Sequence, residues 1–111
     1  MVRRAAPSRG DVIWADFSPT QGHEQSGRRP AVVLTTRDYN ALIGIAIVCP
    51  VTSQMKGYPF EVAISEKKFK GAVLVDQIRA FDWKARGLQK VGEVPETVVL
   101  EVQRKLKTLL M

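Results

Sequence analysis

The residues most capable of chemistry gather in one connection, residues 19–30, which lies between the apolar runs 12–17 and 31–34. A connection of this length in a small chain is usually functional or disordered, and sites are commonly built on loops held by a rigid scaffold. The alternative is a solvated hairpin loop in which glycine and proline only form turns. The ionisable residues of this connection are His23, Glu24, Arg28 and Arg29.

The composition argues against several kinds of catalytic site. One histidine and one cysteine, without metal-ligand spacing, disfavour a zinc site. There is no glycine-rich loop of the P-loop or dinucleotide-binding type, and the acidic residues are too scattered for a two-metal site. We therefore expect neither a metal nor another cofactor. An arginine guanidinium, in contrast, presents a planar fork of donors that matches phosphate oxygens.

Length and charge indicate the class of partner. The 111 residues suit a single domain, 1–111. A domain this small exposes a large share of its surface, so association with another chain would stabilise it. The net charge of +6 favours polyanions, with RNA or DNA as the first candidate and an acidic protein as the second, although it can also serve solubility alone. No apolar run suits a membrane span, no signal peptide is evident, and a single Cys49 fits a reducing compartment. We expect a cytoplasmic protein.

Short apolar runs separated by turn residues predict a mainly β chain. Residues 11–17 alternate, which indicates a strand with both faces partly covered. Trp14 in this strand can stack on a base, but a place in the core or an interface is favoured. Pro50 indicates an edge, an end or a bulge, because proline cannot donate to a strand ladder. Further strands are expected at 31–36, 45–51, 60–64, 72–78 and 89–94, and a turn or single helical turn at 37–42.

The two ends of the chain differ. Residues 1–9 are basic and lack periodicity, so they are expected to form a loose arm. Residues 95–110 are expected to form a helix, with apolar residues at helical spacing and Pro95 and Glu96 at its start. Many short strands followed by one helix suggest a small barrel or curled sheet.

Four ordered blocks carry a family resemblance. They are residues 10–17 (GDVIWADF) with 22–34 (GHEQSGRRPAVVL), 48–54 (VCPVTSQ), 57–62 (GYPFEV) and 73–79 (VLVDQIR). Together they resemble the MazF/PemK family of toxins from toxin–antitoxin pairs, over most of residues 9–110. The resemblance implies an SH3-like barrel of the PemK/CcdB type with a C-terminal helix, normally a homodimer.

The same resemblance implies an activity and a partner. The expected function is sequence-specific cleavage of single-stranded RNA, chiefly mRNA, which inhibits translation and growth. A cognate antitoxin with an acidic, disordered tail would neutralise the toxin by covering its RNA groove. Without a metal, the 2′-hydroxyl of RNA can attack the adjacent phosphorus, provided the enzyme positions the groups, moves protons and stabilises the transition state. The products would be a 2′,3′-cyclic phosphate and a 5′-hydroxyl.

Three residues are the catalytic candidates. Arg29 matches the catalytic arginine of the family's Arg-Pro pair, and its charge favours stabilisation of phosphate because arginine is a poor general base. Thr52 matches a hydroxyl residue beside the scissile phosphate, although it can instead satisfy its own loop. Glu24 can orient Arg29 or accept a hydrogen bond from a base. Ordinary surface or loop roles remain the alternatives for each.

The candidate RNA-binding residues lie in several loops. Gln77 has an amide suited to reading a base edge, while Asp76 beside it is favoured as structural. His23 has a suitable pKa for a general base, but it departs from the serine of a well-known family member. Loops 22–28, 53–56 and 79–86 are expected to set the recognised sequence. The RNA-binding set is Arg28, Ser53, Lys56, Gln77 and Arg86.

Two other functions fit the same sequence features. One is a non-catalytic nucleic-acid-binding barrel, which the basic charge alone would support. The other is a toxin of the same fold that acts on gyrase, although such a protein has no need of a phosphate-cleaving pair.

Overall fold

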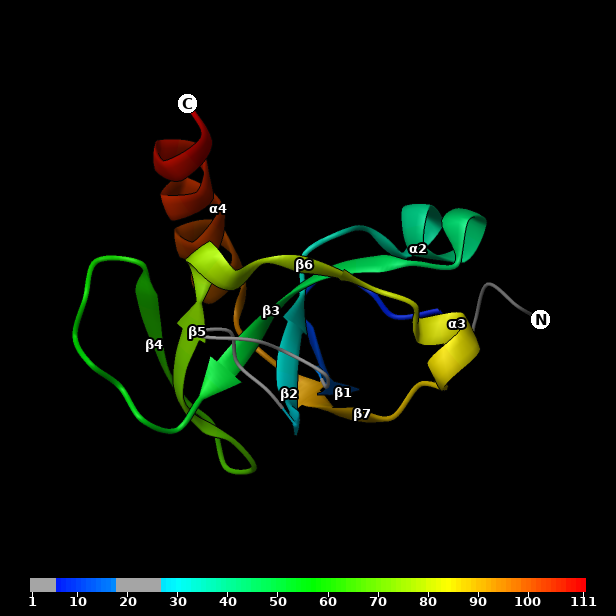
Figure 1. Cartoon of the computed structure of the whole chain (residues 1–111), viewed down its shortest axis with the longest axis horizontal. Coiled ribbons are helices and arrows are strands. Elements are labelled where there is room, and N and C mark those ends of the chain that lie inside the picture. Colours follow the sequence, from blue (N-terminus) through cyan, green and yellow to red (C-terminus); the bar gives the residue numbers. More distant parts are fainter. Residues whose placement is uncertain (1–5, 18–26) are drawn as a thin grey trace.

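A computed structural model describes residues 6–17 and 27–111 of the chain. Within these residues, seven strands pair antiparallel in the order β4-β5-β3-β2-β1-β7, with β6 also paired to β3 (Figure 1). The strands are β1 (Asp11–Asp16), β2 (Arg28–Val33), β3 (Ala46–Thr52), β4 (Glu61–Ser65), β5 (Lys70–Leu74), β6 (Arg79–Phe81) and β7 (Lys90–Glu93). The helices are α2 (Arg37–Ile43), the 3-10 turn η1 (Val75–Gln77), α3 (Trp83–Arg86) and α4 (Glu96–Leu110).

β3 is the central strand and has different partners on one of its sides. β2 pairs along one side, while the other side pairs first with β6 at 46–48 and then with β5 at 51–52. The Leu34 amide donates to the Ile47 carbonyl, so alternation turns the nitrogen of Pro50 away from β2. Pro50 therefore lies where β6 has ended and β5 has not begun, at an interruption of the ladder rather than at the edge of the sheet.

Both faces of the β1–β2–β3 layer are buried, as predicted for residues 11–17. One face packs against α4, and the cluster between them includes Val12, Val32 and Cys49 of the strands with Val99 and Val102 of the helix. The other packs under α3 and includes Ile13, Val33, Val48, Phe81 and Trp83. Successive residues of each strand alternate between these two clusters, which is why the strands read as nearly continuous apolar runs.

The predicted C-terminal helix is confirmed, and α4 begins after Pro95 as its N-cap. Val99 and Val102 are its buried residues and face the sheet. Lys105 on the same helix donates through Nζ to the carbonyl of Glu61 at 3.0 Å, which ties α4 to the start of β4. Among the described residues, no helix is long and apolar enough to cross a bilayer.

The description of residues 1–9 as a loose arm is wrong for residues 6–9, and residues 1–5 lie outside the described part. Ala6 and Pro7 are buried, and Arg9 donates through Nε to the Leu34 carbonyl at 2.6 Å. The buried Asn40 of α2 explains the anchoring. Its side-chain amide nitrogen donates to the Pro7 carbonyl at 2.9 Å, and its main-chain carbonyl accepts from Trp83 Nε1 at 3.1 Å.

Two other expected elements also differ. Residues 37–42 form most of the seven-residue helix α2, with Thr36 as a side-chain N-cap that accepts from the Tyr39 amide. The strand expected at 72–78 ends at Leu74, because the chain turns into η1 before β6 pairs with the first half of β3. The turn was hidden in the sequence because Val75 and Ile78 continue the apolar pattern.

Two glycines allow the sheet to curl. A Cβ placed on Gly71 of β5 would lie 1.9 Å from the carbonyl oxygen of Thr52, and its φ is +133°. A Cβ on Gly92 of β7 would lie 3.0 Å from the ring of Phe69, which sits between β4 and β5. Phe69 therefore brings the β4–β5 end of the strand order close to β7 at the other end. The expected mainly β fold with a C-terminal helix is confirmed, as a half-barrel.

We expect Gly71→Ala to destabilise the protein by about 3 kcal/mol, because the new methyl group must displace the Thr52 carbonyl and also adopts an unfavourable φ. Gly57→Ala is the matched control, since its φ is +77° but no atom lies within 4 Å of the new Cβ. It should cost only about 1–2 kcal/mol. Chemical denaturation checks both, and equal losses would contradict the steric argument.

Candidate active site at the ends of β2 and β3

The strand register brings Arg29 and Thr52 to neighbouring positions. Ala31 of β2 is paired with Pro50 of β3. Two further residues along each antiparallel strand lead to Arg29 on one side and Thr52 on the other. Arg29 is paired with Ala15 of β1, which holds its backbone from the other side.

A hollow of about 270 Å³ opens at these strand ends, and we call it the strand-end hollow. It is lined by Arg28, Arg29, Pro30, Val51, Ser53, Lys68, Phe69 and Lys70. Three predicted residues therefore face one space: Arg28 and Arg29 from β2, and the exposed Ser53 from the end of β3, where Thr52 precedes it in the chain. The hollow suits an anion, because the four ionisable residues of its described lining are all cationic.

Thr52 has a local bond as well as a place beside Arg29. Its side chain is buried, and its Oγ1 accepts a hydrogen bond from the Gln54 amide at 3.1 Å. This is the loop-satisfying role that the sequence left open. A hydroxyl that accepts one hydrogen bond still has its proton to donate, so this bond orients the group without removing its use toward a phosphate oxygen.

Glu61 organises the loop that carries Lys56, and sequence reasoning missed it. Its buried carboxylate accepts from the Lys56 amide at 2.9 Å and from the Gly57 amide at 2.8 Å. The sequence feature that could have revealed Glu61 is an acidic residue at the start of a strand with alternating apolar residues. Lys56 itself is exposed, so the structure fixes its backbone and leaves its side chain in solvent.

Gln77 lies in η1 and lines a separate hollow with its neighbours Asp76, Ile78 and Arg79. Asp76 accepts a hydrogen bond from Tyr58 Oη at 2.7 Å. Partial burial and this hydrogen bond raise the pKa of Tyr58, so its hydroxyl keeps its proton. Asp76 is therefore engaged with the 53–60 loop, in agreement with its expected structural role.

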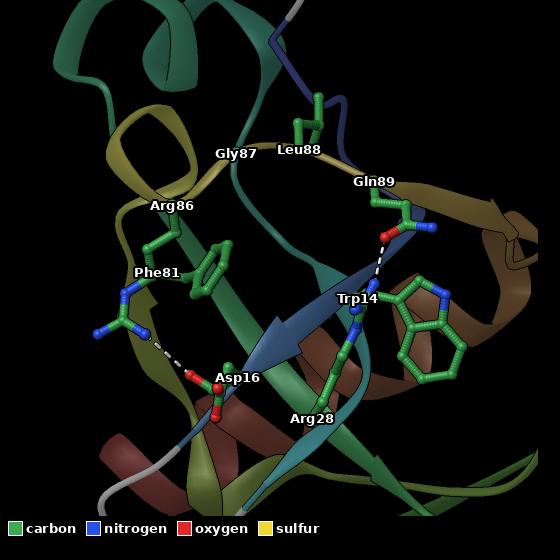
Figure 2. A pocket seen from close by; sticks show the side chains of 8 residues that line it. All are labelled: Trp14, Asp16, Arg28, Phe81, Arg86, Gly87, Leu88 and Gln89. Carbon is green, nitrogen blue, oxygen red and sulfur yellow. Dashed lines mark hydrogen bonds between the residues drawn. The ribbon is translucent and has the colours of Figure 1, made fainter.

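Arg28 and Arg86 both line a larger opening of about 510 Å³, which we call the tryptophan pocket (Figure 2). The guanidinium carbon of Arg28 lies 5.3 Å from the centroid of the Trp14 ring, and Arg28 also donates to Gln89 Oε1. Arg86 donates to the Asp16 carbonyl at 3.2 Å and lies over Phe81. The pocket is lined by Trp14, Asp16, Arg28, Phe81, Arg86, Gly87, Leu88 and Gln89.

Arg28 lines both openings, so the strand-end hollow and the tryptophan pocket share one side chain. Trp14 was expected in the core or an interface; it lies outside the two core clusters, and its half-buried ring forms a wall of this pocket. Glu24 and His23 lie outside the described residues.

A thiol nucleophile and a metal centre receive no support from the described residues. No group of three or more His, Cys, Asp or Glu side chains there is placed to hold a metal ion. Cys49 is close to Thr52 in sequence, but it is fully buried. Burial, reinforced by the negative charge of Asp76, raises the pKa of its thiol from 9.0 to about 12.

This fold is that of a known class of protein. The family model for the PemK-like, MazF-like toxin of type II toxin–antitoxin systems matches residues 8–110, and the chain belongs to this family. It is 44% identical over 110 residues to the endoribonuclease toxin MazF of Escherichia coli K12, covering 99% of each chain. It is 35% identical to the endoribonuclease PemK of Escherichia coli, over 99% of this chain and 87% of that one.

Solved structures agree with the family assignment. MazF of Deinococcus radiodurans superimposes with a TM-score of 0.88 at 45% identity, covering 95% of this chain and 96% of that chain. A MazE–MazF structure from the same organism gives a TM-score of 0.83 at 45% identity with the same coverage.

We expect the Cys49 thiol to resist alkylation and disulfide exchange in the native protein. The raised pKa alone lowers the thiolate fraction at pH 8 by about a thousandfold, and burial blocks access as well. Titration with a chromogenic disulfide reagent at pH 8 should release signal slowly from the folded chain and at once in guanidinium chloride. Equally fast labelling of both forms would contradict the burial.

Proposed function

We propose that this protein, as one domain (1–111), is an endoribonuclease toxin that cleaves single-stranded RNA at specific sequences without a metal ion. Cleavage of mRNA would inhibit translation and growth until a cognate antitoxin neutralises the toxin. One observation carries the proposal: Arg29 and Ser53 line one cationic hollow at the ends of β2 and β3, and Thr52 is the last residue of β3, directly before Ser53. The 44% identity to an endoribonuclease toxin along almost the whole chain supports the same function.

The proposed reaction is an internal transfer at phosphorus. The 2′-oxygen forms a bond to the adjacent phosphorus as its proton leaves to a base, and the bond from phosphorus to the 5′-oxygen breaks as that oxygen gains a proton. Arg29 stabilises the charge on the non-bridging oxygens, and the Thr52 hydroxyl donates a hydrogen bond to one of them. Glu24 orients Arg29 or takes part in proton transfer, and His23 is a further candidate for the base. The products are a 2′,3′-cyclic phosphate and a 5′-hydroxyl.

The RNA strand is proposed to follow the cationic side chains around the strand ends. Arg28 connects the strand-end hollow to the tryptophan pocket, where Arg86 supplies another positive charge. Trp14 offers an aromatic surface of the kind on which bases stack. Ser53, Lys56 and Gln77 extend the proposed contact surface along the loops that follow β3 and β5.

The partners are proposed from charge and from relatives. Two solved structures from Deinococcus radiodurans are of MazE–MazF, so we expect an antitoxin partner for this chain as well. A net charge of +6 favours an antitoxin with an acidic, disordered tail that competes with RNA. We further propose that the protein is a cytoplasmic homodimer.

We expect Arg29→Ala to lower kcat for RNA cleavage by about a thousandfold, because the developing charge loses its principal donor. The measurement is cleavage of a long mixed-sequence RNA in EDTA, with mapping of 5′-hydroxyl ends. Arg104→Ala is the matched control, since Arg104 lies on α4 and pairs with Glu101. Discrete wild-type fragments that persist unchanged in Arg29→Ala would refute the assigned role, and uncut RNA with folded wild type would favour a binding protein or a gyrase-directed toxin.

We also expect Thr52→Val to lower kcat by about a hundredfold and Thr52→Ser to retain most activity, since serine keeps both the accepted and the donated hydrogen bond. Steady-state cleavage of a short RNA containing the mapped sequence measures both. Thermal melting must accompany it, because the Gln54 amide loses its acceptor in Thr52→Val. A fully active, folded valine variant would assign Thr52 to the loop alone.

A further inference from the structure

Two lysines that the sequence reasoning passed over line the strand-end hollow. Lys68 lies in the connection between β4 and β5, and Lys70 is the first residue of β5. Both face the same space as Arg28, Arg29 and Ser53. The hollow therefore receives positive charge from two sides: from the start of β2 and from the β4–β5 hairpin. No acidic side chain is among the lining residues that the structure describes.

The hairpin is anchored so that the two lysines have a defined position. Phe69, between them in the chain, is 7% exposed and packs in the core cluster beneath α4, whereas both lysines are exposed. The Phe69 ring lies against Gly92 of β7, and a backbone hydrogen bond of 3.0 Å from the Glu66 amide to the Phe69 carbonyl closes the turn.

A second anchor joins the hairpin to the candidate catalytic residue. Ala72 is paired with Thr52, and Gly71 lies so close to the Thr52 carbonyl that no side chain could be accommodated there. Lys70 directly precedes Gly71, so its backbone moves with the backbone of Thr52. The positions of these lysines are thus coupled to the place where the scissile phosphate is proposed to bind.

Neither lysine is neutralised by its surroundings. In the described part of the chain, no ion pair or side-chain hydrogen bond involves Lys68 or Lys70. Lys90, in contrast, pairs with Asp11 at 3.2 Å and with Glu93 at 2.8 Å. Because the two ammonium groups have no ion-pair partner among residues 6–17 and 27–111, their mutual repulsion is relieved when a polyanion binds.

We propose that Lys68 and Lys70 bind an RNA phosphate next to the scissile one and hold the backbone of the strand against Arg29 and Thr52. This inference rests on the proposed function and adds substrate-binding residues to it. Ammonium groups on flexible stems contact phosphate mainly through charge. The pair therefore raises affinity for single-stranded RNA of any sequence and leaves the choice of the cleaved sequence to other residues.

The test is a double variant, Lys68→Gln/Lys70→Gln, assayed on a short RNA that contains the mapped cleavage sequence. Loss of two phosphate contacts should raise KM roughly tenfold at low salt and reduce the slope of log(kcat/KM) against log[salt] by about 1.4. We expect kcat within about twofold of wild type and an unchanged cleavage sequence, because the reacting groups remain. Lys68→Arg/Lys70→Arg should restore both KM and the salt slope.

The matched control removes two positive charges elsewhere. Arg104→Gln/Lys107→Gln changes two exposed residues of α4, outside the strand-end hollow, and should leave KM near wild type. Binding of a fluorescent, 2′-O-methylated RNA, which cannot be cleaved, reports the lysine contribution independently of catalysis.

Distinct outcomes separate the two proposals. Normal cleavage with unchanged KM, salt slope and RNA binding in the hairpin variant overturns the lysine inference and leaves the proposed function intact. Binding that depends on the lysines without any wild-type cleavage refutes the proposed function and retains a phosphate-binding hairpin. Unchanged RNA affinity with weaker inhibition by an acidic antitoxin peptide assigns the lysines to the antitoxin and overturns the RNA assignment.

Discussion

The pairing of β3 with two successive partners on one side is the constraint on which the rest of this structure depends. β6 pairs with its first half and β5 with its end, and Pro50 lies at the interruption because it needs no partner for an N–H. This change of partner brings Gly71 against the Thr52 carbonyl. It also lets β2 run along the opposite side, so that Arg29 ends beside Thr52 while the β4–β5 hairpin reaches the same place.

Charge is distributed unevenly over the strand ends that this arrangement creates. Adjacent residues of a strand point to opposite faces of the sheet. The long side chain of Arg28 nevertheless lines both the strand-end hollow and the tryptophan pocket. Its guanidinium is held by Trp14 and Gln89, and Arg86 is held by a main-chain carbonyl. Such bonds limit the conformations of long basic side chains before a polyanion arrives, which lowers the entropy lost on binding.

Local patterns predicted much of the fold and part of the candidate site. The alternation of residues 11–17 was sufficient to predict a strand, and the apolar spacing of residues 95–110 was sufficient to predict a helix, because burial on a strand or helix repeats with a fixed period. Thr52 and Arg29 were found through their motif blocks rather than through periodicity. Lys68, Lys70 and Glu61 were missed, since a lysine beside a turn and an acid in a strand have no signature until their neighbours are known. Residues 6–9 resembled an arm because their anchor, Asn40, is distant in the sequence.

By itself, the sequence determined the class of fold, the positive charge and the family, because these follow from composition, local periodicity and ordered motifs. Only the tertiary structure decided which charges share a surface. The register between β2 and β3 and the contact of Gly71 with Thr52 join segments that are far apart in the chain. Such juxtapositions arise from sheet pairing and close packing, which depend on the whole set of strands and not on any one stretch of residues.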